Sequence, residues 1–293
     1  MNKIAKFLIS FGVFVVICAV ALNWFVHSEV RKELDRTVAQ TPGLTLTYDN
    51  LSVDIYDHMV TLENVNATLP SGQHFSADTL RIDDFDQRNP IPHHAHATAS
   101  RLSCAVTPEN FGEWTDIMLK SGIDSIVGNI ELDYTYDATN GILTLETLSM
   151  DDPKLGHAML TCAVDGIDLN DMRLEQLVGL RLDNATLRFT DRSLTKTVVR
   201  NWSAAMNMSE TLTVATIQHE LAGLAEHAAS KENDVAEDVM LGLRRFMGDP
   251  ATMTVSISPK EPFPVLYFFM GRDIFETMQL LNMKIVTTSS DGI

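Results

Sequence analysis

The chain has 293 residues, and 45% of them are hydrophobic, which is enough apolar material for one large or two small domains and argues against disorder. Its formal net charge is −17 at pH 7, which disfavours nucleic acid and anionic lipid headgroups as partners over most of the surface. The three cysteines form no C-x-x-C spacing, so the sequence gives no support to a metal or redox site.

The first predicted element is a transmembrane helix from Phe7 to Val26. Asn23 is its only strongly polar residue, and Lys3 and Lys6 precede it. At about 1.5 Å per residue it spans about 30 Å, the thickness of a bilayer's hydrocarbon core. The side chains expected to hold this anchor in the bilayer are Phe7, Leu8, Phe11, Phe14, Val16, Ile17, Leu22, Trp24 and Phe25.

A cleaved signal peptide is the competing interpretation of the same segment. The first six residues form a basic region, an apolar stretch follows, and Ala19-Val20-Ala21 offers an A-x-A cleavage site. The apolar run continues past that site to Val26, and Trp24 stands where an interfacial aromatic belongs. These two features favour an uncleaved anchor.

The remainder is too polar to span a membrane and divides into a linker and a body. Residues 1–28 are a cytoplasmic stub with the anchor, and residues 29–43 a juxtamembrane helix or linker that stops at Thr41-Pro42-Gly43. Residues 44–293 are the body, with a sub-boundary near 107–128. A long domain behind a short anchor is translocated largely regardless of flanking charge, so in a Gram-negative source the body is expected in the periplasm.

Residues 44–106 alternate between apolar and polar positions, which predicts a meander of antiparallel strands with one polar face. The alternation breaks at Glu63-Asn64, where the apolar set moves to Val65, Ala67 and Leu69. Such a parity shift indicates a β-bulge or a change of face. A second shift follows along Phe75, Ala77, Leu80 and Ile82, and residues 88–96 read as a loop.

The run YDNLSVDIYDHMVTLENVNATLPSGQHFSADTLRIDDFD resembles the membrane-proximal module of AsmA-like envelope proteins. Hydrophobic spacing directly after an anchor carries this resemblance, and no functional residue transfers with it. It implies a protein of the inner membrane and periplasm, linked to envelope integrity and to phospholipid movement along a hydrophobic β-groove. The chain is far shorter than the large members of that family, so a role in bridging the periplasm is not implied.

The second half of the chain becomes increasingly helical. Asn140-Gly141 predicts a hairpin turn, and residues 180–189 repeat the parity shift. Three helices are then expected: one capped by Asp191 or Ser193, one opened by Ser209 and one opened by Asp234. A short helix near 171–178, a strand at 253–257, a partly helical stretch at 265–281 and a short last strand complete the pattern. The predicted fold class is therefore α+β, an N-terminal transmembrane helix followed by a curved antiparallel sheet with helices packed against it.

Three groups of residues are candidates for a site. Cys104 and Cys162 lie in similar strand-like runs, facing a core, where they either form a disulfide or stay buried and free. His94 and His96 are spaced to share a metal, but no neighbouring ligand completes a site, so an exposed polar segment is the preferred interpretation. Leu266, Tyr267, Phe268 and Phe269 either contact an apolar ligand or a membrane, or fill the core.

No catalytic signature is present in the sequence. HELAG at His219 lacks the second histidine of a zinc protease motif, because that position is Gly223. No catalytic residue, cofactor or metal is therefore assigned, and the chain is not expected to be an enzyme. Its expected partners are the inner membrane, phospholipid and other envelope proteins, with lipid handling as the leading function. A non-catalytic scaffold with a filled core is the alternative.

Overall fold

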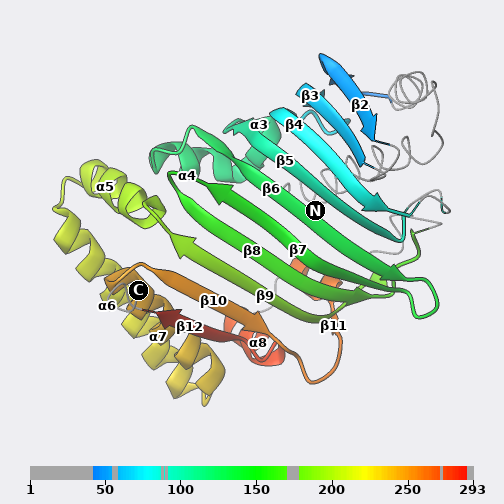
Figure 1. Ribbon diagram of the computed structural model, residues 1–293. Helices are drawn as coiled ribbons and strands as arrows, with labels where there is room; N and C mark the ends of the chain where they lie inside the picture. The colour runs from blue at the N-terminus through cyan, green and yellow to red at the C-terminus, as the bar shows by residue number, and fades with distance from the viewer. Residues whose placement is uncertain are drawn as a thin grey trace. The chain divides into compact units, whose positions relative to one another are not determined.

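The computed structural model describes residues 42–54, 59–86, 89, 92–169, 178–270 and 273–288 (Figure 1). The predicted anchor, the linker up to residue 41 and most of the short helix expected at 171–178 lie outside these residues. Within the described part of the chain, no helix has the length and apolar character needed to cross a membrane.

Strands dominate the first half of the described chain and helices the second. In order, the elements are β1 (Thr45–Thr47), β2 (Asn50–Asp54), β3 (Met59–Thr68), β4 (His74–Phe85), β5 (His94–Ala105), α3 (Pro108–Phe111), η1 (Gly112–Trp114), α4 (Thr115–Lys120), β6 (Ser125–Asp137), β7 (Ile142–Asp152), β8 (Gly156–Asp165), β9 (Arg181–Asp191), α5 (Leu194–Met206), α6 (Glu210–Ser230), α7 (Asp234–Gly248), β10 (Thr252–Ile257), β11 (Phe263–Pro264), η4 (Val265–Phe269), α8 (Ile274–Leu280) and β12 (Lys284–Thr288).

The chain forms two compact units, and both are built on antiparallel sheet. The first contains the described residues up to Leu119, with 123–138 and 146–152, and the second contains 120–122, 139–145 and the described residues from Pro153. The chain therefore first passes between units at residues 119–123, which fall inside the stretch 107–128. It passes again between residues 138 and 153, because β7 contributes to both units.

In the first unit the strand order is β1-β3-β4-β5-β6. Both β1 and β2 pair with the same edge of β3, β2 along residues 59–63 and β1 along residues 66–68. β7 follows β6 in this order, and β1 pairs with neither of them, so the sheet is open. Its apolar face is buried along the three central strands. The residues concerned are Val60, Leu62, Val65, Ala67, Phe75, Ala77, Leu80, Ile82, Ala95, Ala97, Ala99, Leu102 and Cys104.

The predicted parity shifts are confirmed, and they line up across neighbouring strands. Leu62 lies opposite Leu80 on β4, and on the far side of the shift Val65 lies opposite Ala77, so both strands carry one extra residue at the same level. β5 has its extra residue there too, but β6 does not, and the β5–β6 register slips between Ala99 and Leu102. This bulge line, the row of extra residues in β3, β4 and β5, keeps the apolar side chains of all three strands on one face.

Polar contacts hold the bulge line. Asn64 and Arg101 have positive φ values of 51° and 49°, an uncommon conformation for residues other than glycine. The Asn64 amide donates to Asp49 at 2.8 Å, and the Arg101 guanidinium lies 3.4 Å from the carboxylate of Asp78. The Arg101 backbone N–H donates to the Asn129 side chain at 3.0 Å.

A short helix is fixed to this sheet by one buried side chain, that of Asn110 on α3. Its carboxamide oxygen accepts from the His74 N–H at 2.9 Å, and its amide donates to the Ala105 carbonyl at 2.7 Å. Thr107 caps the helix by accepting from the Asn110 N–H. From Pro108 the chain forms three short helical pieces in succession, α3, η1 and α4.

The second unit is an antiparallel sheet with helices packed on it. Its strand order is β8-β9-β10-β12, with β11 added to β9, and β8 and β12 do not pair, so this sheet is open too (Figure 1). The helices α6 and α7 pack against each other, and α7 packs on β12. Their shared core contains Ala225, Ala228, Ala236, Val239, Met240, Phe275 and Met278.

The helix starts confirm most of the sequence expectations and correct one. The Asp191 carboxylate accepts from the Thr195 N–H at 2.9 Å, so Asp191 supplies the hydrogen bond at the start of α5. The Ser209 hydroxyl accepts from the Leu212 N–H and begins α6 as predicted. The cap of α7 is Asn233 and not Asp234, because the Asn233 side chain both accepts from the Ala236 N–H and donates to the Phe275 carbonyl.

Candidate apolar-ligand site

The sheet of the second unit has two chemically different faces, as its register shows. Leu160 lies opposite Leu187, and Leu187 lies opposite Val255. Paired residues of antiparallel strands project to the same face, so these rows define an apolar face. Its members are Ala158, Leu160, Cys162, Ala185, Leu187, Phe189, Met253, Val255, Ile257 and Ile285. The opposite face carries Thr161, Thr186, Arg188, Thr254, Ser256, Lys284 and Val286.

The helix α7 covers one end of the apolar face, and a buried cluster of side chains covers the other. At one end Phe189 meets Phe246 of α7 edge to face, with ring centroids 6.2 Å apart. The same helix approaches β12 so closely that a Cβ on Gly242 would lie 2.8 Å from Ile285. At the other end Phe263, Leu281 and Leu182 form a second buried cluster, against which Cys162, Ala185 and Ile257 pack.

Between these clusters the apolar face is only partly covered. Leu187, in the middle of β9, keeps 39% of its surface exposed. Its cross-strand neighbours Leu160 and Val255 are half-buried, as are Ala158, Phe189 and Met253 in the adjoining row. We call these six residues the apolar strip. In the first unit, by contrast, the equivalent face is buried along β3, β4 and β5, and Val53 on β2 is the residue of that face that stays exposed, at 37%.

The segment from η4 to α8 carries a second set of exposed apolar side chains. Leu266 and Phe268 are 36% and 46% exposed, and Met270 and Ile274 are 61% and 63% exposed. Tyr267 of the same segment instead packs against the buried cluster and meets the Phe263 ring edge to face, with ring centroids 5.6 Å apart. Four large exposed apolar side chains within nine residues are typical of an interaction surface.

The sequence candidates Leu266, Tyr267, Phe268 and Phe269 therefore have different environments. Tyr267 packs against the buried cluster, whereas Leu266 and Phe268 are partly exposed. Phe268 also contacts the Phe263 ring, with centroids 5.2 Å apart. The side chain of Phe269 lies outside the described residues.

The two cysteines of the body are free thiols, so the structure does not contain the disulfide considered for them. Cys104 belongs to the first unit and Cys162 to the second. Burial raises the pKa of the Cys104 thiol to about 12 and also raises the pKa of Cys162. Because a thiolate is the reactive form, neither residue is arranged as a nucleophile.

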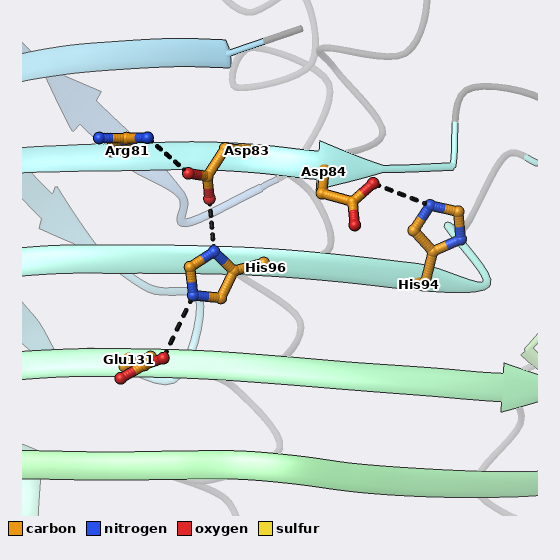
Figure 2. Close-up of polar contacts among 6 residues, drawn as sticks. All are labelled: Arg81, Asp83, Asp84, His94, His96 and Glu131. Atoms are coloured by element: carbon orange, nitrogen blue, oxygen red, sulfur yellow. Dashed lines mark hydrogen bonds and ion pairs between the residues drawn. The ribbon is translucent and has the colours of Figure 1, made fainter. Parts of the chain in front are cut away.

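A connected polar cluster lies on the polar face of the first unit, across β4, β5 and β6. Figure 2 shows His96 between two carboxylates: its Nδ1 lies 2.5 Å from Asp83 Oδ1, and its Nε2 lies 3.3 Å from Glu131 Oε1. Arg81 donates to the other oxygen of Asp83 at 2.7 Å. Nearby, His94 Nε2 lies 3.5 Å from Asp84 Oδ1.

This geometry favours a charged His96. Burial disfavours the imidazolium, but the hydrogen bonds to Asp83 and Glu131 and the charges of Asp83 and Asp133 outweigh it and raise the pKa of His96. Both ring nitrogens face an acceptor, so neither is free to take a proton from a nucleophile. The arrangement is therefore that of an ion pair and not of a general base.

His94 and His96 do not form a shared site. Both belong to β5, so the expected loop at residues 88–96 ends earlier than predicted and the strand begins at His94. Each imidazole is engaged by a different carboxylate, Asp84 for His94 and Asp83 for His96. Within the described ranges, no three histidine, cysteine or acidic side chains are placed to hold a metal ion.

Sequence reasoning did not single out the apolar strip. The alternation of Ala185, Leu187 and Phe189 in the sequence indicates only that these three side chains share one face of a strand. Nothing in that alternation distinguishes a strand face covered by helices from one that is half open. The signal is tertiary, because it depends on where α7 and the Phe263 cluster lie along the strands.

A family model described as "Uncharacterized protein" matches residues 142–288, about half of the chain. The match begins at the first residue of β7 and ends at the last residue of β12. It therefore covers the apolar strip and the η4–α8 segment. The comparison with curated proteins finds no match.

Proposed function

The chain belongs to the family described as "Uncharacterized protein", and from this premise we propose that the module it shares with that family, residues 142–288, binds an apolar chain such as the acyl tail of a lipid. The half-open apolar strip around Leu187 is the observation that carries this proposal. Exposure of apolar surface to water costs about 25 cal/mol of free energy per Å². An acyl chain laid along the strands would remove that surface from water.

The proposed setting is the inner membrane. The apolar segment Phe7–Val26 would tether the chain there, with the body in the periplasm, as its resemblance to AsmA-like proteins also implies. The exposed side chains of Leu266, Phe268, Met270 and Ile274 suit contact with the same bilayer, from which the lipid would be taken. Because the chain carries a net charge of −17, this contact would be apolar and with uncharged or zwitterionic lipid.

Acyl-chain binding is tested with a matched pair of variants on opposite faces of one sheet. Leu187→Asp places a charge in the apolar strip, whereas Val286→Asp places it on the opposite face, where Val286 is 62% exposed. The full-length protein is extracted in detergent and titrated with a fluorescent fatty acid, and lipid retained after purification is identified by mass spectrometry. We expect Leu187→Asp to lose both signals and Val286→Asp to keep them, with thermal melting confirming that both variants fold.

Equal binding by the wild type and Leu187→Asp would reject the proposal, as would an absence of binding by the wild type. The scaffold function is the second candidate, and it is favoured by the first unit, whose apolar face is buried along β3, β4 and β5 and leaves no room for a ligand there. Under that alternative the wild type retains no lipid.

A further inference from the structure

We propose that His96 is an acid-engaged lock, a protonated side chain that joins β4, β5 and β6 on the polar face of the first unit and releases them when it loses its proton. His96 lies on the middle strand of the three. Asp83 on one side and Glu131 on the other each take one of its ring nitrogens, at 2.5 Å and 3.3 Å (Figure 2). Only the imidazolium donates from both nitrogens, so both bonds exist together only while the ring is charged.

The charges around His96 come from both neighbouring strands. β4 supplies Asp83, which lies directly opposite His96 and also accepts from Arg81. β6 supplies Glu131 and also Asp133, which lies directly opposite His96 on that side. On β5 itself, His94 pairs with Asp84 instead. Three carboxylates thus surround one imidazole and one guanidinium, and loss of the His96 proton leaves two of the three without a cation.

The release has a defined direction in pH. Because folding raises the pKa of His96, the contribution of the lock to stability is fully present below the unfolded-state pKa, near 6.5, and is lost as the pH rises through the folded-state value. The His96 side chain is 30% exposed, so its proton exchanges with solvent and the lock responds to the pH outside the protein.

Loss of the His96 proton weakens the pairing of β5 with β4 and β6. In the deprotonated state one ring nitrogen becomes an acceptor facing a carboxylate, either Asp83 or Glu131. The repulsion is placed between adjacent strands, so it loosens the cross-strand contacts of β5 rather than a single loop.

Nuclear magnetic resonance tests the protonation state in the full-length, detergent-extracted protein labelled with ¹⁵N-histidine. We expect His96 to titrate above the value of an ordinary histidine and to show two protonated ring nitrogens below its midpoint. Glu131→Gln keeps an acceptor but removes a charge, so it should shift the midpoint of His96 downward. An unshifted midpoint in Glu131→Gln, or a neutral tautomer in the wild type at pH 6, overturns the proposal.

Hydrogen exchange tests the release of the strands. After correction for the intrinsic pH dependence of exchange, peptides from β4, β5 and β6 should lose protection in the wild type between pH 6 and pH 8. His96→Gln should abolish that pH dependence. His94→Gln is the matched control, since His94 lies two residues away on the same strand, is 46% exposed and pairs with an exposed carboxylate. Protection that does not change with pH in the wild type, or a loss that persists in His96→Gln, contradicts the lock.

Discussion

Two glycines in neighbouring helices have opposite surroundings. Gly223 of α6 is exposed, and a Cβ there would meet nothing within 4 Å. Gly242 of α7 faces β12, and a Cβ there would lie 2.8 Å from Cγ2 of Ile285. The same substitution therefore tests helix propensity at one position and packing at the other.

We predict that Gly223→Ala stabilises the protein by about 0.5–1 kcal/mol, because alanine loses less backbone entropy in a helix than glycine does. Gly242→Ala gains the same propensity term, but its methyl group must displace α7 from β12, at a cost of about 1–3 kcal/mol. The net effect of Gly242→Ala should be destabilising. Thermal melting of both variants against the wild type measures the difference, and a stabilised Gly242→Ala would show that the helix is not seated on Ile285.

Sequence reasoning anticipated some single residues and missed others for a physical reason. Ser209 was identified as a cap because a hydroxyl directly before an apolar helical pattern has one obvious local partner. Asn110 was missed, because its partners are the backbone groups of His74 and Ala105, which are not its neighbours along the helix. His96 was seen as one of a group of histidines, but its relation to Asp83 and Glu131 depends on strand register, and the stretch had been assigned to a loop.

At the scale of elements, α8 depends on a charged cap. The Asp273 carboxylate accepts from the Phe275 N–H at 2.8 Å, and its second oxygen lies 3.3 Å from the Lys231 ammonium. The backbone hydrogen bond and the lysine together lower the pKa of Asp273. Its contribution is therefore present above the unfolded-state pKa and lost as the pH falls through the lower folded-state value.

We predict that acidification frays α8 before it affects α6, whose cap Ser209 does not titrate in this range. Asp273→Asn should weaken α8 at neutral pH and remove its dependence on acid. Hydrogen exchange of peptides from the two helices, measured above the pH of global unfolding, gives the comparison. If the α8 amides of the wild type stay as protected as those of α6 down to that point, the cap does not control the helix.

Element types were easier to predict than element roles. The strands before residue 106 and the three helices after residue 193 follow from periodicity, because an amphipathic pattern is a local property of the sequence. The open apolar strip and the buried sheet face of the first unit have the same alternating pattern, and only the placement of helices and loops makes them different. Periodicity therefore identified which face was apolar but not which apolar face was available to a ligand.

At the scale of the whole molecule, the proposed anchor would decide in which compartment the body works. The twenty residues from Phe7 to Val26 are expected to remain attached, so the protein recovered from membranes should have the mass of the full chain and should resist extraction by alkaline carbonate. The signal-peptide interpretation gives a different result, a mature chain that begins at Leu22 and is released with soluble proteins. Intact-mass spectrometry of both fractions separates the two.

The family match and the resemblance to AsmA-like proteins concern different parts of the two-unit chain, so an experiment on one part does not test the other. The family match covers residues 142–288, whereas the AsmA-like run lies entirely in the first unit. The resemblance and the family membership thus concern different parts of the chain. Loss of lipid binding in Leu187→Asp would therefore assign a lipid-binding function to the second unit alone.

The bulge line of the first unit constrains how this chain can change length. β3, β4 and β5 each hold one surplus residue at the same level, and the register among these three strands is the same on both sides of it. Deleting Asn64 alone would turn every apolar residue of β3 either before or after that position toward the solvent. The reason is that removing one residue from a strand moves the side chains beyond it to the opposite face of the sheet. Insertions and deletions in these strands should consequently survive only in coordinated sets, and divergent relatives of this unit should either keep all three surplus residues or lack all three.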